Sequence, residues 1–230
     1  IHRHLCYLTD SQAQALQDTF QVIASPSNVV QALFLNNAVE PLNDVRVRQA
    51  ILYALDKDAV NDFVGGGNGA LISSATLPTL QDYYVDLNDV YGTGANVEKA
   101  KELLTDAGFP DGFDLEIAIP SNYEFHMQTG EVVVEHLKAV GINATIQAVE
   151  WNTWLEEIYN GRQYQATISG ITCDMTPGYL LNRFQTDSKK NFINFQSEEY
   201  DEIYQKAQET LDLKEKAEYY AQLHQILVDQ

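Results

Sequence analysis

Basic residues are scarce in this 230-residue chain. It carries 14 Lys and Arg against 33 Asp and Glu, which leaves a formal net charge of −19. Its longest basic run is the pair Lys189-Lys190. Nucleic acids are held by neutralising their phosphates with Lys and Arg, so a surface this acidic would repel them. The composition therefore excludes DNA and RNA as partners.

Cysteine and the common catalytic motifs are also missing. Cys6 and Cys173 are the only thiols, too few for a disulfide scaffold or a zinc site, and the sequence leaves open whether they pair. No His-Glu-x-x-His, Gly-Lys-Ser/Thr or Gly-x-Ser-x-Gly pattern occurs. We therefore expect no metal, no cofactor and no catalytic residue.

Long apolar runs are absent as well. No stretch approaches the roughly 20 apolar residues that span a bilayer, whereas 45% hydrophobic residues overall suit a folded globular core. The chain opens with Ile1-His2-Arg3-His4, without an initiator Met or a signal-peptide pattern. We expect a fragment or a processed chain.

Apolar periodicity then indicates the fold class. Residues 113–119, 143–149 and 165–169 alternate as strands, and the two segments between them show the helical period. Asn152 is expected to cap the second of these helices. Short connections in such a βαβαβ run favour parallel strands with right-handed crossovers. The sequence predicts an α/β fold with a mainly parallel sheet.

Further helices are expected on both sides of this unit. Residues 44–54 and 58–64 read as short helices, Asn96 caps a third, and Ser197 caps the first of two near the end of the chain. Residues 70–93 read as mostly irregular. An acidic group within them resembles part of a calcium loop but lacks its glycine and terminal glutamate, which favours a solvated loop. Its members are Asp82, Asp86, Asn88 and Asp89.

Topology selects the candidate site. Ligands of open parallel sheets bind outside the carboxyl ends of the strands, which here carry the loops 120–123, 150–152 and 170–174. The candidate binding residues in these loops are Asn122, Tyr123, Trp151, Ile171, Thr172 and Asp174. They offer aromatic faces, a phenol, an amide and a carboxylate, which suit a small amphiphilic cation or a peptide.

Each of these residues also has a purely structural interpretation. Trp151 could pack at the edge of the sheet, and Asp174 could cap the following turn. Asn122 and Tyr123 could be ordinary loop residues. The sequence alone leaves both interpretations open.

Several segments, in order along nearly the whole chain, resemble one family. The sequence is similar to extracellular solute-binding proteins of the peptide/nickel family, which serve ABC importers. The segments are 36–57 (beginning NNAVEPLNDVRVRQA), 98–104 (EKAKELL), 107–113 (AGFPDGF), 137–142 (LKAVGI), 150–154 (EWNTW), Asn194-Phe195 and Tyr200-Asp201.

The resemblance implies a receptor of two lobes that closes over its ligand, with the type II fold of periplasmic binding proteins. Residues 29–230 match its carboxyl-terminal lobe, truncated before the last return strands. Residues 1–28 would lead in from the missing amino-terminal lobe. Arg46 and Arg48 are expected to anchor a helix near the hinge and not to touch ligand.

The resemblance also suggests roles for two residues. Peptide-binding members carry Gly-Trp-x-x-Asp after the third strand, and the Asp holds the α-ammonium of the peptide. Here the segment reads Gly170-Ile171-Thr172-Cys173-Asp174, so Asp174 matches the carboxylate while Ile171 replaces the usual tryptophan. Trp151 matches a family tryptophan that lines a side-chain pocket.

The implied function is the substrate-binding component of an ABC importer that captures oligopeptides. It would work with permease and ATPase subunits, at the extracellular face of the cytoplasmic membrane or in the periplasm, tethered by a lipid on the missing N-terminus. It would not be an enzyme. Alternatives are a receptor for another solute, such as a nickel chelate or a sugar, and a hydrolase lobe that uses cleft carboxylates.

Overall fold

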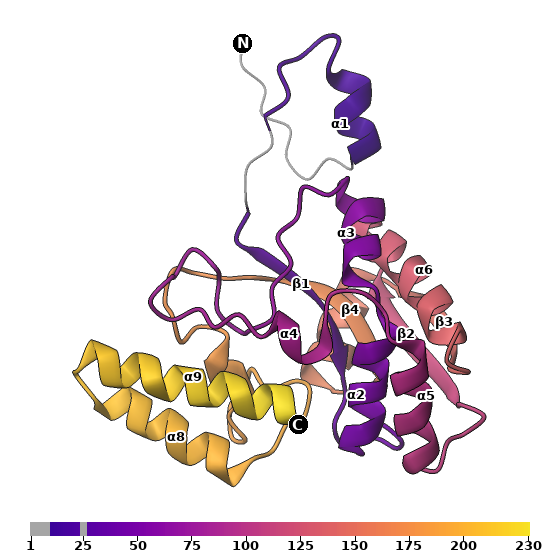
Figure 1. The fold of residues 1–230 in the computed structure, drawn as a ribbon. Coiled ribbons are helices and arrows are strands. Elements are labelled where there is room, and N and C mark those ends of the chain that lie inside the picture. The colour runs from indigo at the N-terminus through magenta and orange to yellow at the C-terminus, as the bar shows by residue number, and fades with distance from the viewer. Residues whose placement is uncertain (1–9, 24–26) are drawn as a thin grey trace.

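A four-stranded sheet organises the chain. The computed structural model describes residues 10–23 and 27–230 (Figure 1). The strands are β1 (Val29–Leu35), β2 (Asp114–Pro120), β3 (Asn143–Val149) and β4 (Ala166–Thr172). Their order in the sheet is β1-β4-β2-β3. β2 pairs in parallel with β3 and β4, which confirms the predicted α/β class, while β1 is an antiparallel edge strand that the periodicity did not reveal.

Some helices pack beside the sheet and others lie away from it (Figure 1). In chain order they are α1 (Asp10–Leu16), α2 (Val45–Ala54), α3 (Lys57–Gly65), α4 (Asn88–Tyr91), α5 (Val97–Asp106), α6 (Glu124–Lys138), α7 (Trp151–Thr153), the π-helix η1 (Trp154–Asn160), the 3-10 turn η2 (Leu181–Phe184), α8 (Glu198–Glu209) and α9 (Leu213–Asp229). The predicted caps at Asn96 and Ser197 each accept a backbone N–H, so these helix starts are confirmed. Asp44, the first residue of the helix expected over 44–54, also caps α2 by accepting the Arg46 backbone N–H.

Alternation along the strands divides the core between the two faces of the sheet. On β2, Leu115, Ile117 and Ile119 pack in one cluster with residues of α2, α5 and α6. Ala118 points to the other face, where it packs with Trp154 and other aromatic residues. Side chains of a strand alternate in direction, so successive residues of β2 point to opposite faces of the sheet. Both faces are buried here, and the sheet lies between two hydrophobic clusters.

The last two helices form a separate layer. α8 and α9 lie side by side, away from the sheet (Figure 1), and share a cluster that contains Tyr200, Ile203 and Leu223. Buried His224 of α9 lies 3.3 Å from the backbone N of Ala75 and 3.1 Å from the hydroxyl of Thr76. These bonds attach the irregular segment before α4 to the helical pair.

Two local predictions were wrong. The third strand does not stop at Ser169: β4 runs to Thr172, because Ile171 and Thr172 pair with Val30 and Val29 of β1. Asn152 does not cap the helix after β3. Glu150 caps it instead, because the carboxylate of its side chain accepts hydrogen bonds from the backbone N–H groups of both Asn152 (2.7 Å) and Thr153 (3.3 Å).

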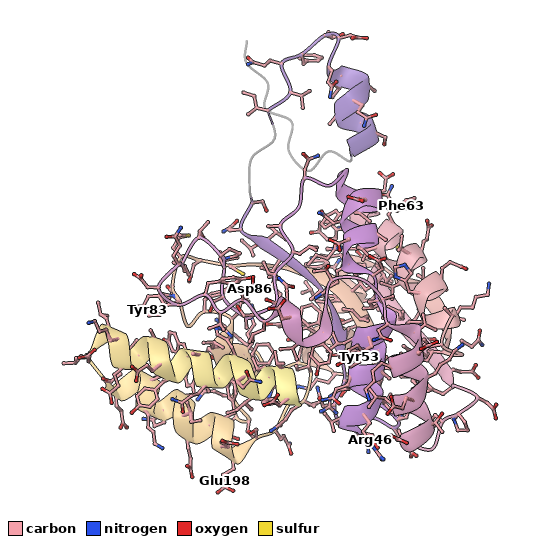
Figure 2. The ribbon with its side chains drawn as sticks, in the orientation of Figure 1. Arg46, Tyr53, Phe63, Tyr83, Asp86 and Glu198 are labelled. Atoms are coloured by element: carbon pink, nitrogen blue, oxygen red, sulfur yellow. The ribbon has the colours of Figure 1, made fainter. Side chains whose placement is uncertain are left out.

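The calcium-like segment is held by internal hydrogen bonds. Asp86, labelled in Figure 2, precedes α4 in the chain and accepts bonds from the Ser73 hydroxyl (3.2 Å) and the Asn88 backbone N–H (3.0 Å). Within residues 10–23 and 27–230, no three His, Cys, Asp or Glu side chains converge on a metal position. In the same ranges, no helix is long and apolar enough to cross a bilayer. Cys6 lies outside the described residues.

Candidate functional site

Two of the predicted site residues meet at the carboxyl ends of β2 and β3. The rings of Tyr123 and Trp151 are 5.5 Å apart between centroids and inclined by 78°, an edge-to-face contact. Their loops are joined because the Ser121 N–H donates to the Val149 carbonyl at 2.8 Å. Both side chains are half-buried. The sheet topology thus brings a tyrosine and a tryptophan from separate loops into one aromatic surface.

A buried layer supports this aromatic pair. The Trp151 ring stacks on Trp154, with centroids 5.2 Å apart and planes 6° apart. Trp154 is 5% exposed, and its indole N–H donates to the Thr167 hydroxyl at 2.9 Å. That hydroxyl donates in turn to the Ala118 carbonyl at 2.6 Å. The stack therefore links β2, β4 and η1, and it holds Trp151 in a defined orientation.

A polar group that sequence reasoning missed lies beside Tyr123. His126, in the first turns of α6, is 3% exposed and lies 5.3 Å from the Tyr123 ring. Its Nδ1 is 2.6 Å from the Gln31 amide oxygen, and Gln31 donates to the Thr129 hydroxyl at 2.5 Å. Burial lowers the pKa of His126 to about 4, so its ring is neutral near pH 7. An isolated histidine on an apolar helix gave no signal in sequence.

The fit of His126 depends on Gly170 of β4. A Cβ at Gly170 would lie 3.2 Å from Cε1 of His126 and 2.8 Å from Val29. The glycine of the family-like motif therefore makes room for the histidine ring and for β1. This role could not be assigned before β1 was known to be the neighbour of β4.

Asp174 follows β4 at the edge shared with β1. Its side chain is exposed, and Oδ1 accepts a bond from the Thr176 backbone N–H at 2.8 Å. Asp174 thus caps the following turn, as its structural interpretation predicted, and one of its carboxylate oxygens is hydrogen-bonded within that turn. The preceding residue, Cys173, is buried, and its backbone N–H donates to the Asn28 carbonyl at 2.8 Å. Burial raises the pKa of the Cys173 thiol.

The remaining predicted residues have mixed placements. Ile171 is half-buried and packs against the aromatic cluster of η1, whereas Thr172 and Asn122 are exposed. Ile171 and Thr172 belong to β4 and not to a loop. Among the described residues, no hydrogen bond or ring contact joins Asp174 to Tyr123 or Trp151. The site consists of an aromatic part and an acidic part at one edge of the sheet.

One bacterial protein family matches most of this chain. Residues 5–192 match the sequence profile of the bacterial extracellular solute-binding proteins, family 5 Middle. The chain belongs to this family. Membership confirms the resemblance that the motifs along the sequence indicated.

Curated relatives are similar over most of this chain but are much longer. The dipeptide-binding protein of Escherichia coli K12 is 28% identical over 95% of this chain and 42% of its own length. Oligopeptide-binding protein OppA of Salmonella typhimurium is 28% identical over 84% of the chain and 36% of its own length. Heme-binding protein A of Haemophilus influenzae is 27% identical, with shares of 88% and 38%. This chain spans less than half the length of these relatives.

Solved structures show the same fold. The substrate-binding protein CtaP of Listeria monocytogenes superposes with a TM-score of 0.87 at 21% identity, covering 96% of this chain and 46% of CtaP. AppA of Bacillus subtilis in complex with a nonapeptide gives 0.79 at 23% identity, with shares of 88% and 43%. AgaA of A. tumefaciens R10 with agropinic acid gives 0.78 at 25% identity, with shares of 88% and 42%. The fold is that of type II periplasmic binding proteins.

Proposed function

We propose that this chain is the ligand-binding part of a receptor that captures oligopeptides outside the cytoplasmic membrane and delivers them to an ABC importer. One observation carries the proposal. In a chain of this family, Tyr123 and Trp151 form an aromatic surface at the edge of the sheet where Asp174 also lies. The names of the E. coli and S. typhimurium relatives, which bind dipeptides and oligopeptides, support this ligand class.

The residues would act by binding alone. Asp174 would pair with the α-ammonium of the peptide, a charge-assisted contact that strengthens once closure of a second lobe excludes water. Trp151 and Tyr123 would line a pocket for a side chain, with Ile171 beside them, and Asn122 and Thr172 would supply polar contacts at the rim. No nucleophile is required, and the relatives named above are binding proteins, so the hydrolase alternative has no support among them.

The wider arrangement is part of the same proposal. Residues 29–230 would form the carboxyl-terminal lobe, and residues 1–28, which contain α1, would lead in from an amino-terminal lobe. The receptor would dock on permease subunits driven by an ATPase, and a lipid on its N-terminus would hold it at the extracellular face of the membrane or in the periplasm. The family's extracellular character supports this location.

A non-peptide solute is the second candidate. One relative is named for binding heme, and AgaA was solved with agropinic acid. Ile171 stands where peptide-binding members usually carry a tryptophan, so this chain offers a smaller apolar surface at that position. This difference would suit a receptor of the same fold that binds a ligand other than a peptide.

Native mass spectrometry of the full-length protein that carries this chain, purified from its host, tests the proposal. A series of co-purifying masses that match short peptides would support it. A single non-peptide mass would favour the second candidate. Trp151→Ala should lose the co-purified ligand, and Glu218→Gln on α9 serves as the matched surface control. Retention of the same ligand by Trp151→Ala would contradict the assignment of the site.

A further inference from the structure

Two cationic side chains converge on one aromatic ring close to the candidate site. The Arg183 guanidinium carbon lies 5.7 Å from the centroid of the Tyr179 ring, and the Lys190 ammonium lies 5.1 Å from it. The aromatic ring attracts each of the two cations. The result is a local concentration of positive charge in a chain whose net charge is −19.

These cations are not neutralised by the abundant carboxylates. Within residues 10–23 and 27–230, the ion pairs are Arg46–Asp44, Lys99–Glu102 and Lys138–Glu135. Arg183 instead donates from Nη1 to the Tyr159 hydroxyl at 3.2 Å, and its Nε is buried without a hydrogen-bond partner. A buried donor without a partner costs free energy. Arg183 therefore has an unused donor and an uncompensated charge.

The position of this group connects the two parts of the candidate site. Tyr179 lines a small cavity together with Asp174 and Cys173. Tyr159, which accepts the bond from Arg183, lies 5.9 Å from the Trp154 ring, on which Trp151 stacks. Through Tyr179 and Tyr159, the cations are connected to the acidic segment after β4 and to the aromatic stack.

We infer that Arg183 and Lys190, held over Tyr179, form a subsite for a carboxylate of the bound ligand. This inference deepens the proposed receptor function and rests on it. The Arg183 guanidinium supplies charged N–H donors for a carboxylate, and the flexible ammonium of Lys190 adds a second charge. Asp174 carries a negative charge, whereas Arg183 and Lys190 are positive. Together they would complement the opposite charges of a zwitterionic ligand. The carboxylate comes from the C-terminus of a peptide or from an acidic side chain.

Glutarate tests the subsite independently of any peptide. The probe is added to the full-length protein with 15N-labelled arginine, and glutaramide serves as the uncharged control. The Arg183 Nε–H signal is identified by its loss in Arg183→Lys. We expect this signal to move saturably with glutarate and to stay in place with glutaramide. Absence of a saturable shift would overturn the inference, whatever else the protein binds.

Matched peptides identify the source of the carboxylate. Calorimetry compares Ala-Glu-Ala with Ala-Gln-Ala, and Ala-Ala-Ala with its C-terminal amide. The wild type should prefer the charged member of one pair by roughly tenfold or more, since hydrogen bonds to charged groups are the strong ones. Arg183→Gln should remove this preference, while Arg183→Lys should keep part of it. Equal binding of both members in both pairs would contradict the subsite.

Lys189 supplies the control for general charge. It is exposed and adjacent to Lys190 in sequence, so Lys189→Met and Lys190→Met change the net charge equally. Only Lys190→Met should weaken the preference for the carboxylate, and an equal effect of both variants would reject a specific role for Lys190. If glutarate moves the Arg183 signal but no peptide binds, the peptide function fails and the subsite stands.

Discussion

Trp151 and Trp154 stack with their ring planes 6° apart, although one is half-buried at the edge of the sheet and the other is a core residue. Tyr123 makes an edge-to-face contact with Trp151, with ring centroids 5.5 Å apart. The solvent-facing ring is therefore fixed by a buried one, whose N–H is bonded to Thr167. A surface held in this way loses little conformational entropy when a ligand packs on it.

The stacked pair should separate stability from binding. Trp154→Ala should destabilise the protein by about 3 to 5 kcal/mol, because it opens a cavity and removes the bond to Thr167. Trp151→Ala should cost clearly less stability but weaken ligand binding. Urea unfolding and calorimetry measure the two effects. Equal losses of stability for both variants would mean that Trp151 is as much a core residue as Trp154.

Asp174 should distinguish free from blocked amino termini. Asp174→Asn should weaken binding of a peptide with a free α-ammonium by roughly tenfold or more, because one partner of a charged hydrogen bond is lost. The N-acetylated peptide should bind the two proteins equally. Asp187→Asn, an exposed carboxylate nearby in sequence, is the control. If Asp174→Asn binds both peptides like the wild type, the carboxylate only caps its turn.

Two buried histidines should make stability depend on pH. Burial lowers the pKa of both His126 and His224 to about 4, from an ordinary value of 6.5. The unfolded chain takes up protons near pH 6.5 while the folded chain does not until about pH 4. Their contribution is therefore complete above pH 6.5 and is lost as the pH falls, by about 1.4 kcal/mol per pH unit for each histidine.

Urea unfolding between pH 7.5 and 5 measures this slope before most carboxylates titrate. The double variant His126→Gln, His224→Gln should be less stable at pH 7.5 and should show a flatter dependence on pH. A wild-type free energy of unfolding that stays level or rises toward pH 5 would be inconsistent with buried neutral rings.

Substituting three glycines by alanine should destabilise the protein to different degrees, according to the backbone φ and the space around each glycine. Gly94 has open space where a Cβ would be, Gly108 has open space but a φ of +93°, and Gly112 has a φ of +77° with a Cβ position 1.9 Å from the Gly141 carbonyl oxygen. Gly94→Ala should be nearly neutral, Gly108→Ala should cost about 1 kcal/mol through the left-handed backbone, and Gly112→Ala should cost several times more. Thermal unfolding of the three variants checks this order. A loss for Gly94→Ala equal to that of Gly112→Ala would refute the explanation.

Local patterns in the sequence were sufficient for much of the fold. The strands at residues 113–119 and 143–149 and the caps at Asn96 and Ser197 are confirmed because each depends on neighbouring residues. The cap at Asn152 was wrong because two side chains competed for the same N–H groups and Glu150 reached them. Propensity ranks residue types but does not say which neighbour has the better geometry.

The candidate site was only partly accessible from sequence. The rule for carboxyl ends of parallel strands brought Tyr123 and Trp151 together correctly. It could not reveal His126, because its partners Gln31 and Gly170 lie on strands far away in the chain. Nor could it reveal that Arg183 and Lys190 share the Tyr179 ring, since η2 and the segment after it have no periodic pattern.

By itself, the sequence determined the α/β class, the parallel strands and the family, because periodicity, helix caps and ordered motifs are properties of neighbouring residues. Tertiary structure decided that β1 joins the sheet beside β4 and extends it to Thr172. It also decided which side chains share a cavity or a ring at the site. Such contacts join residues distant in the chain, and they form only when the whole core closes and the cost of ordering the loops is offset by burial.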